Sequence, residues 1–184
     1  MTQIRDEHGG SGRGGVLSRE QLRTLIVGVE RPLVRELVAL EEQLQPNGVD
    51  LTLREVSRHV GAGALGASGS DRVLPQLEPL PFDAEGWVTL PPGCYHIMYN
   101  EIVDIPVGLM ALGRPRSSLN RCGVTIHTAV WDAGYRGRST SLLVVHNPDG
   151  FRLQRNARVM QLVFLGMADA PEEGYRGRYQ HENV

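Results

Sequence analysis

Four side chains within one hexapeptide have the chemistry to bind a polyanion: Arg116, Ser117, Ser118 and Arg121. Guanidinium groups match the geometry of phosphate oxygens, and serine hydroxyls donate short hydrogen bonds to them. A solvated turn would have the same composition, so the hexapeptide alone is compatible with either role. The whole chain carries 19 Lys and Arg against 21 Asp and Glu, which excludes a general electrostatic field for nucleic acid or an anionic membrane. Phosphate recognition would therefore depend on this local cluster.

Two further polar residues, Asp132 and Gln161, could have either a chemical or a structural role. Asp132 precedes Ala133-Gly134-Tyr135, a sequence typical of a turn just outside a strand. A carboxylate there could orient and deprotonate a water molecule for attack on phosphorus, or it could serve the turn alone. Gln161 lies in an apolar run, so as a structural residue it would need buried partners. A phosphate contact explains Gln161 better.

Five stretches resemble, in order and spacing, the motifs of the trimeric dUTPase/dCTP deaminase superfamily, and most of all those of the archaeal-type dUTPases. They are QPNGVDL (45–51), PRSSLNR (115–121), TAVWDAGYRG (128–137), ARVMQL (157–162) and YRGRYQ (175–180). Each stretch alone is a weak signal. Because all five occur in the right order between residue 45 and the C-terminus, the chain is identified as a member of this superfamily.

The resemblance implies a role for each of these residues. The substrate-binding residues would be Arg116, Ser117, Ser118, Arg121 and Gln161 for the phosphates, Thr128 and Ala129 for the nucleoside, and Tyr175, Arg178 and Gln180 in a segment that closes over the substrate. Tyr135 would lie flat against the deoxyribose and leave no room for a ribose 2′-hydroxyl, and Asp132 would be the catalytic base. Asp50 would either support the water or cation or anchor its loop by hydrogen bonds, and both alternatives remain open.

The resemblance also implies a cofactor and an assembly. Mg²⁺ would enter with the substrate, because it prefers triphosphate oxygens and water to a dedicated protein cage. No His/Cys/carboxylate cluster in the sequence suggests a metal held directly by the protein. The expected partners are dUTP and two further copies of the chain, in a homotrimer with active sites at the subunit interfaces. Neither a nucleic acid nor a membrane is expected as a partner.

The choice between hydrolysis and deamination depends on one glutamate. In the deaminases it lies on the strand after the third motif, and two ways of counting place it at Leu142 or Val144. Residues 138–147 contain no carboxylate, and aliphatic groups cannot relay protons; the zinc-deaminase signature is also absent. We therefore expect hydrolysis of dUTP to dUMP and pyrophosphate, with an Asp132-activated water attacking the α-phosphate. The alternatives are a dCTP deaminase, including a bifunctional one, and a non-catalytic nucleotide-binding relative.

The elements that must position these residues are short β-like runs separated by Pro and Gly, as in sandwiches and barrels. Strands are expected at 51–53, 87–90, 94–99, 102–105, 107–112, 124–128, 141–146 and 159–165, with a loop at 61–70 and a turn at 147–150. Ser18 and Gln21 have the spacing of a capping box, which predicts a helix from about Arg19 and a further helical turn or two between 33 and 43. The predicted fold class is mainly β: a dUTPase-like β-barrel or jelly-roll-type domain with a short helical N-terminal segment.

The length of 184 residues fits one domain. Residues 1–15 are expected to be a disordered leader, and 16–184 a single dUTPase-like domain whose arm, from about 168 to 184, is mobile. Two cysteines are too few for a disulfide framework and indicate reduced thiols. The N-terminus has no apolar signal core and the chain has no run long enough to span a membrane, which predicts a cytoplasmic protein.

Overall fold

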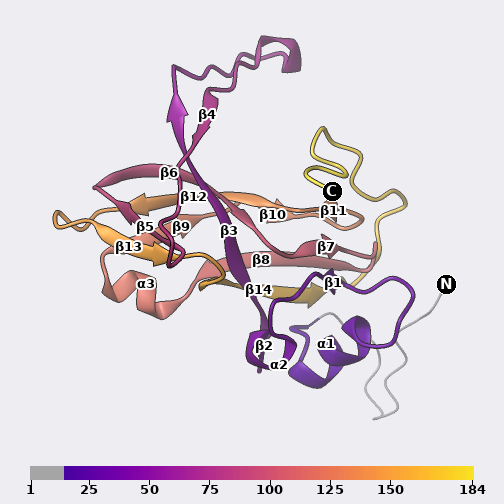
Figure 1. Cartoon of the computed structure of the whole chain (residues 1–184). Helices are drawn as coiled ribbons and strands as arrows, with labels where there is room; N and C mark the ends of the chain where they lie inside the picture. The colour runs from indigo at the N-terminus through magenta and orange to yellow at the C-terminus, as the bar shows by residue number, and fades with distance from the viewer. Residues whose placement is uncertain (1–14) are drawn as a thin grey trace.

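The computed structural model describes residues 15–184 of the chain, and antiparallel strands dominate it (Figure 1). The largest sheet of the described residues runs in the order β10 (Val130–Trp131), β8 (Leu109–Pro115), β14 (Arg158–Gly166), β3 (Gly48–Val60), β6 (Gly93–Tyr99), β12 (Thr140–Val145) and β9 (Val124–His127), with β2 (Leu44–Gln45) and β4 (Gln76–Pro79) also paired to β3. Two small sheets accompany it: β1 (Val34–Arg35), β7 (Ile102–Asp104) and β11 (Arg136–Gly137); and β13 (Phe151–Gln154) with β5 (Trp87–Leu90). The mainly β fold class predicted from the sequence is confirmed.

Strand β3 bends the large sheet because its two halves pair with different neighbours. Its first half pairs with β14 and β2, and its second half pairs with β6 and β4. The register shifts between Leu53 and Glu55 opposite β6, and between Arg158 and Met160 opposite β3. Such irregularities bend a strand and increase its twist. The sheet therefore curls around a core in place of lying flat.

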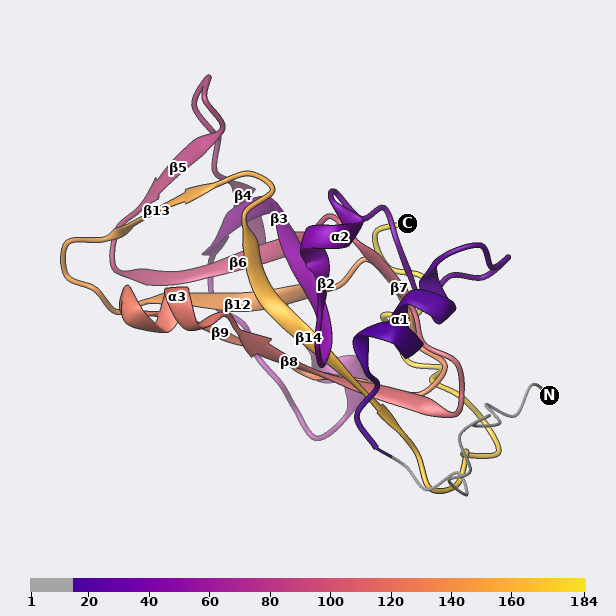
Figure 2. The same ribbon diagram turned by 90° about the horizontal axis from the view of Figure 1, so that it is seen from below.

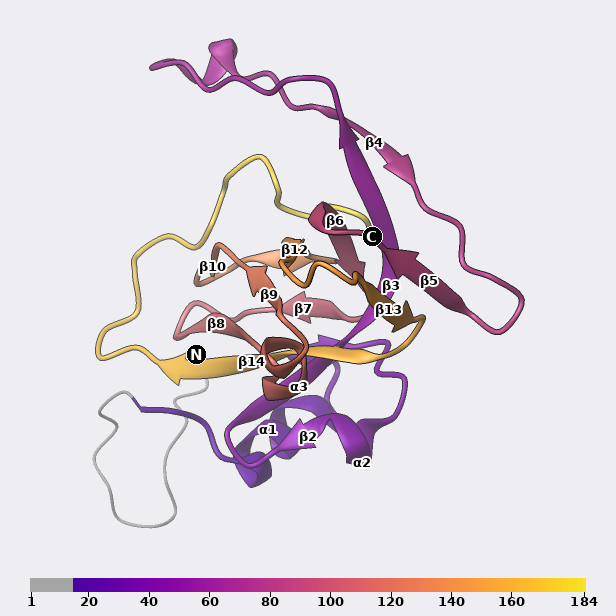
Figure 3. The same cartoon turned by 90° about the vertical axis from the view of Figure 1, so that its left-hand side faces the viewer.

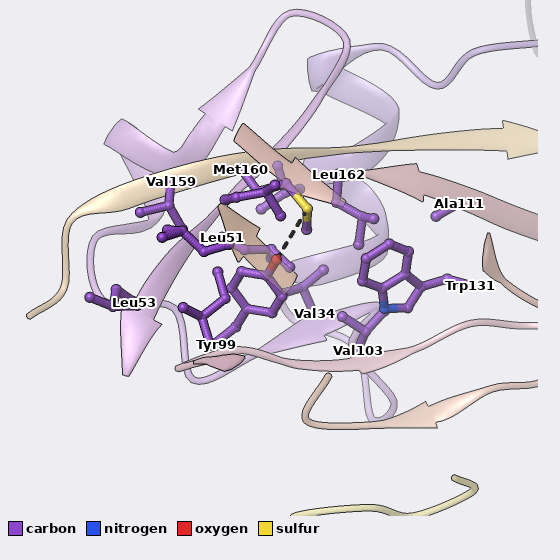
Figure 4. Packing of buried hydrophobic residues seen from close by; sticks show 14 of the residues in the cluster. Val34, Leu51, Leu53, Tyr99, Val103, Ala111, Trp131, Val159, Met160 and Leu162 are labelled. Carbon is purple, nitrogen blue, oxygen red and sulfur yellow. Dashed lines mark hydrogen bonds between the residues drawn. The ribbon is translucent and has the colours of Figure 1, made fainter. Parts of the chain in front are cut away.

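The core lies inside this curl (Figure 4). Tyr99 and Phe164 are its largest fully buried side chains. The Tyr99 hydroxyl donates to the sulfur of Met160 over 3.3 Å, and burial raises the pKa of this phenol. Burying side chains of this size contributes about 1.5–3 kcal/mol each from the removal of apolar surface from water. The strands that carry the polar motifs are thus fixed on one rigid core.

The N-terminal helices cover one side of the β2–β3–β14 region (Figure 2). Helix α1 (Arg19–Ile26) begins with the predicted capping box. The Ser18 hydroxyl accepts from the Gln21 amide, and the Gln21 side chain accepts from the Ser18 amide. The helical prediction for 33–43 is wrong over its first part, since only α2 (Leu40–Gln43) is helical and Val34–Arg35 form β1. Pairing of β1 with β7 satisfies that backbone and overrides the local helical preference.

Each predicted strand overlaps a strand of the structure, although β3 (48–60) extends well beyond the predicted 51–53 and β8 (109–115) is displaced from the predicted 107–112. The strand at 87–90 and the turn at 147–150 are confirmed, the latter by a 3.0 Å hydrogen bond from the Gly150 amide to the Asn147 carbonyl. The sequence does not predict β2, β4, β10, β11, β13 or the helix at Ser117–Arg121, each of which has at most five residues. All four residues of β4 are exposed, so its sequence has no apolar face to mark it as a strand. The expected loop at 61–70 lies at the tip of an arm that β3 and β4 extend away from the rest of the domain (Figure 3). Its last residues begin the short 3₁₀ turn η1 (Gly69–Asp71).

The predicted leader lies outside the described residues except for Gly15. None of the helices within residues 15–184 combines the length and the apolar character needed to cross a membrane. Both cysteines, Cys94 and Cys122, are free thiols at exposed positions, in agreement with the prediction.

Candidate functional site

The carboxylate of Asp50 joins two arginines that are far apart in the chain. One Asp50 oxygen lies 2.6 Å from Nη1 of Arg116, which follows β8, and 3.6 Å from Nη1 of Arg158, which begins β14. Asp50 is only 2% exposed. Burial raises the pKa of Asp50, and the two guanidinium groups oppose that rise. Because Asp50 holds only one edge of the Arg116 guanidinium, the rest of that group can face an anion.

Helix α3 (Ser117–Arg121) displays the remaining polar residues of the second motif beside Arg116. Arg116 is the N-cap of the helix, and its amide donates to the Val159 carbonyl over 3.0 Å, which fixes the start of the helix to β14. Ser117, Ser118 and Arg121 are all exposed. Their hydroxyl and guanidinium groups are therefore available to a ligand on the outer surface.

Gln161 lies in the same part of the sheet, directly opposite Asp50 on β3 and Arg114 on β8. A Cβ atom at Gly48 would meet the Leu162 carbonyl oxygen at 2.5 Å and the Gln161 Cγ at 3.0 Å, so only glycine allows this close approach of β3 and β14. Arg116, Arg158 and Gln161 thus all lie next to Asp50, and Ser117, Ser118 and Arg121 follow Arg116 on helix α3. We call this group the arginine cluster: Asp50, Arg116, Ser117, Ser118, Arg121, Arg158 and Gln161.

Asp132 lies in the turn between β10 and β11, where its side chain is exposed. The Tyr135 amide donates to the Asp132 carbonyl over 3.0 Å, and Gly134 adopts a left-handed φ of +84°. A Cβ atom on Gly134 would also lie 2.7 Å from the Cα of Gly174. The turn therefore needs glycine both for its own conformation and for the C-terminal segment that passes beside it.

Residues 175–183 are held along this turn and β11 (Figure 1). The hydrogen bonds run from the Tyr175 amide to the Ala133 carbonyl (2.7 Å), from Gln180 Nε2 to the Gly134 carbonyl (2.9 Å), from the Arg136 amide to Gln180 Oε1 (2.9 Å), from the His181 amide to the Arg136 carbonyl (2.7 Å) and from the Arg138 amide to the Glu182 carbonyl (3.0 Å). Arg178 is exposed on this segment. The predicted arm is therefore docked on the third motif, and its mobility stays a prediction.

Tyr135 packs beneath this docked segment. Its ring meets that of Tyr175 edge to face at a centroid distance of 5.8 Å. Its hydroxyl lies 3.0 Å from Ser139 Oγ and donates to a Glu182 carboxylate oxygen over 2.8 Å. Only 7% of Tyr135 is exposed, and burial raises the pKa of the phenol. Contact of this ring with a sugar would require the docked segment to shift.

Thr128 and Ala129 lie between β9 and β10, with Thr128 partly buried and Ala129 exposed. The Thr128 methyl group is 2.9 Å from where a Cβ on Gly113 would be, so Thr128 packs against β8. On the neighbouring strand β12, Leu142 lies in register with His96 on β6 and His127 on β9. Strand β12 itself contains no carboxylate.

The arginine cluster and Asp132 lie at opposite ends of β8. Trp131 pairs with Ala111 near the start of that strand, whereas Arg116 directly follows its end at Pro115. A strand of 7 residues extends about 20 Å. One copy of the chain therefore does not bring Asp132 next to Arg116.

Sequence reasoning missed two charged residues of these groups. Arg158 belongs to the fourth motif, and its position three residues before Gln161 was a signal that could have identified it. Glu182 binds the hydroxyl of Tyr135 from 47 residues away in the chain. No local pattern in the polar C-terminal segment could have indicated that contact.

The fold and the arginine cluster define a mainly antiparallel β domain with guanidinium and hydroxyl donors gathered in one region of its surface. Residues 16–167 match the family model described as dCTP deaminase-like, and the chain belongs to that family.

Individual proteins similar to this chain agree with that family. A probable deoxyuridine 5′-triphosphate nucleotidohydrolase of Methanosarcina mazei is 53% identical over 169 residues, which cover 92% of this chain and 98% of the relative. The protein of the same name from Archaeoglobus fulgidus is 48% identical over the same shares of both chains. The crystal structure of 2′-deoxycytidine 5′-triphosphate deaminase from Agrobacterium tumefaciens shares the fold, with a TM-score of 0.65 and 22% identity over 83% of this chain and 49% of that one. The chain thus spans about half the length of that deaminase.

Proposed function

We propose that the protein hydrolyses dUTP to dUMP and pyrophosphate. The observation that carries this proposal is its identity of about half to the archaeal nucleotidohydrolases over 98% of their length. The chemistry of the strands agrees, because β12 carries Leu142 and Val144 where a deaminase of this superfamily needs a glutamate. Deamination of dCTP is the alternative reaction, and an assay that follows both products distinguishes it from dUTP hydrolysis.

In this mechanism the arginine cluster binds the triphosphate and Asp132 supplies the base. Asp132 orients a water molecule and accepts its proton as the water oxygen bonds to the α-phosphorus. The bond from the α-phosphorus to the bridging oxygen then breaks, and pyrophosphate leaves with the electron pair. Arg116, Arg121 and Arg158 stabilise the negative charge that develops on the phosphate oxygens. Tyr135, Thr128 and Ala129 would contact the nucleoside, and Tyr175, Arg178 and Gln180 would close the site.

Magnesium fits this arrangement as an ion carried by the substrate. Within residues 15–184, no three His, Cys, Asp or Glu side chains gather closely enough to hold a metal ion. Asp50, the buried carboxylate of the arginine cluster, is already bound by two arginines. Mg²⁺ on the triphosphate would neutralise phosphate charge and orient the leaving group.

We propose a homotrimer in which each active site is completed by a second copy of the chain. The distance along β8 between Asp132 and the arginine cluster supports an active site shared between subunits. Across β14, β8 and β10, the side chains of Val163, Leu112 and Val130 form one row in register. Leu112 is 40% exposed and Val130 is 49% exposed, which provides an apolar surface suited to a subunit contact. We propose that this trimer acts in the cytoplasm.

One assay tests the proposed reaction directly. Purified protein is incubated with dUTP or dCTP and Mg²⁺, and pyrophosphate and ammonia are followed separately. We expect pyrophosphate from dUTP, loss of that activity with a chelator, and no ammonia from dCTP. Ammonia release at a rate comparable to pyrophosphate release would establish the deaminase instead. Release of neither product would leave a nucleotide-binding protein without this catalysis.

A further inference from the structure

Glu101 is a fully buried carboxylate at the junction between β6 and β7. It accepts hydrogen bonds from the Thr52 amide (2.9 Å), Thr52 Oγ1 (2.6 Å) and Gln43 Nε2 (2.7 Å). All three donors are uncharged. A buried charge of this kind costs stability relative to a well-packed apolar side chain. Its presence therefore calls for an explanation beyond packing.

Gln43 connects this carboxylate to the backbone of Asp50. The same Nε2 group that donates to Glu101 also donates to the Asp50 carbonyl over 2.8 Å, and Gln43 Oε1 accepts from the Ala39 amide over 2.7 Å. Gln43 is 1% exposed and Asp50 is 2% exposed. Glu101 thus fixes β3 on both sides of residue 51: at the Thr52 amide directly and at the Asp50 carbonyl through Gln43.

The other end of Asp50 holds the phosphate-binding arginine. Its carboxylate is 2.6 Å from Arg116 Nη1, and its backbone is paired with Gln161. A continuous line of contacts therefore runs from Glu101 through Gln43 and Asp50 to Arg116. A small displacement of β3 at Asp50 would move the guanidinium away from where the phosphates must lie.

We propose that Glu101 and Gln43 are positioning residues for the triphosphate site, and that they act on phosphate binding through Asp50 and Arg116. This inference rests on the proposed function for the identity of the ligand. Glu101 touches no part of the arginine cluster except through Gln43 and β3, so it is not itself a catalytic residue. The interaction explains why the chain carries a buried acid where an apolar side chain would be more stable.

The test is a double-mutant cycle with inorganic tripolyphosphate as the probe, measured by calorimetry on the full-length protein. Glu101→Gln turns one of the two acceptor oxygens into an NH2 donor, which then faces either the Thr52 amide or the Gln43 Nε2 and Thr52 Oγ1 donors, so we expect roughly a tenfold loss of tripolyphosphate affinity. The affinity for deoxyuridine, which has no phosphate, should not change. Glu55→Gln on the exposed part of β3 is the matched control and should leave both affinities unaltered.

The Arg116→Lys background separates positioning from a general loss of stability. If Glu101 acts through Arg116, Glu101→Gln should lower tripolyphosphate affinity much less in that background, while the drop in Tm stays the same. An equal loss of affinity in both backgrounds, or wild-type affinity in Glu101→Gln, would overturn the inference.

A second variant and a separate readout keep the outcome decisive. If Glu101→Gln does not fold, Gln43→Met replaces it. This variant removes the contacts from Gln43 to Glu101 and to the Asp50 carbonyl but leaves the two hydrogen bonds between Glu101 and Thr52, and the same criteria apply. Tripolyphosphate binding does not depend on turnover. Failure of dUTP hydrolysis in the wild type would therefore refute the proposed function without deciding this inference, which the cycle decides by itself.

Discussion

Asp132 and Asp50 occupy opposite environments, which fit the two different roles proposed for them. Asp50 is buried, and its carboxylate binds Arg116 and Arg158. Asp132 is exposed in a turn, where a water molecule and a substrate phosphate can reach it. A general base must be accessible to the water that it activates, whereas a carboxylate that positions arginines works best when it is shielded from water. The two environments match these two requirements.

Asp132→Asn is predicted to remove turnover and keep binding. An amide retains the shape of the turn but accepts no proton, and loss of a general base typically lowers the rate by about 10²–10⁴. Steady-state pyrophosphate release and dUTP affinity should be measured together. Asp149→Asn, in the exposed turn at 147–150, is the matched control and should keep wild-type turnover. Near-normal turnover of Asp132→Asn would remove the catalytic role from this residue.

Tyr135 is predicted to determine the preference for dUTP over UTP through its ring. Tyr135→Ala should relax that preference, since the added ribose hydroxyl would no longer collide with an aromatic surface. Tyr135→Phe keeps the ring and loses only the bonds to Ser139 and Glu182, so it should keep the preference. The kcat/KM ratio for the two substrates checks both variants. Unchanged discrimination in Tyr135→Ala would leave Tyr135 with a packing role alone.

At the scale of elements, the C-terminal segment and the β10–β11 turn behave as one unit. The segment has no helix or strand of its own and is held by backbone and side-chain hydrogen bonds to residues 133–138. Its few apolar contacts include the edge-to-face pair of Tyr175 with Tyr135. Segments with few buried apolar contacts open at low free-energy cost. Opening and docking of residues 175–183 would therefore control access to Tyr135.

Docking of this segment is predicted to weaken as the pH rises. Burial raises the pKa of Glu182 above its ordinary value of 4.5, although the hydrogen bond from Tyr135 opposes that rise. The docked form thus binds a proton more tightly than the open form. Its extra stability is present below the ordinary pKa and is lost as the pH rises through the docked value. Amide chemical shifts of Gly134 and Gly174, followed from pH 5 to pH 7.5, should report the change.

Glu182→Gln is the control for this titration. An uncharged side chain at the same place should abolish the pH dependence of docking without removing the segment from the turn. A pH dependence of the same size in Glu182→Gln would show that another group titrates.

At the scale of the whole molecule, the curled sheet separates the two halves of the proposed site. Arg116 follows one end of β8 and Asp132 lies near the other end, while the apolar row of Val163, Leu112 and Val130 lies between them. A subunit contact over that row would bury apolar surface and could bring the Asp132 turn of one copy to the arginine cluster of another. Assembly and catalysis would then depend on the same surface.

Mixed oligomers are predicted to recover activity that neither parent has. Asp132→Asn and Arg116→Ala protein, unfolded and refolded together, should form some sites that contain a wild-type Arg116 and a wild-type Asp132. Pyrophosphate release by the mixture should exceed the sum of the separate proteins. Mixing Asp132→Asn with the Asp132→Asn/Arg116→Ala double variant is the control and should recover nothing. Light scattering gives the mass of the oligomer, and an active monomer would contradict the shared site.

Local sequence determined a large part of this protein. The Ser18–Gln21 capping box, the strand at 87–90 and the turn at 147–150 each depend on hydrogen bonds or residue preferences within a few positions, so their patterns predict them correctly. The motifs that identify the family are equally local, and they give the residue types that the chemistry requires. They do not bring the phosphate contacts together, because that depends on the long-range pairing of β8 with β14.

Only the tertiary structure decided the remaining features. The pairing of β1 with β7, which displaced a predicted helix, joins residues far apart in the chain. Asp50 meets Arg116 across 66 positions and Gln43 meets Glu101 across 58, which no local spacing encodes. The burial of Tyr135 under residues 175–183 and the separation of Asp132 from Arg116 along β8 follow from strand register. Register is set by the packing of the entire core, so these contacts cannot be read from any one segment.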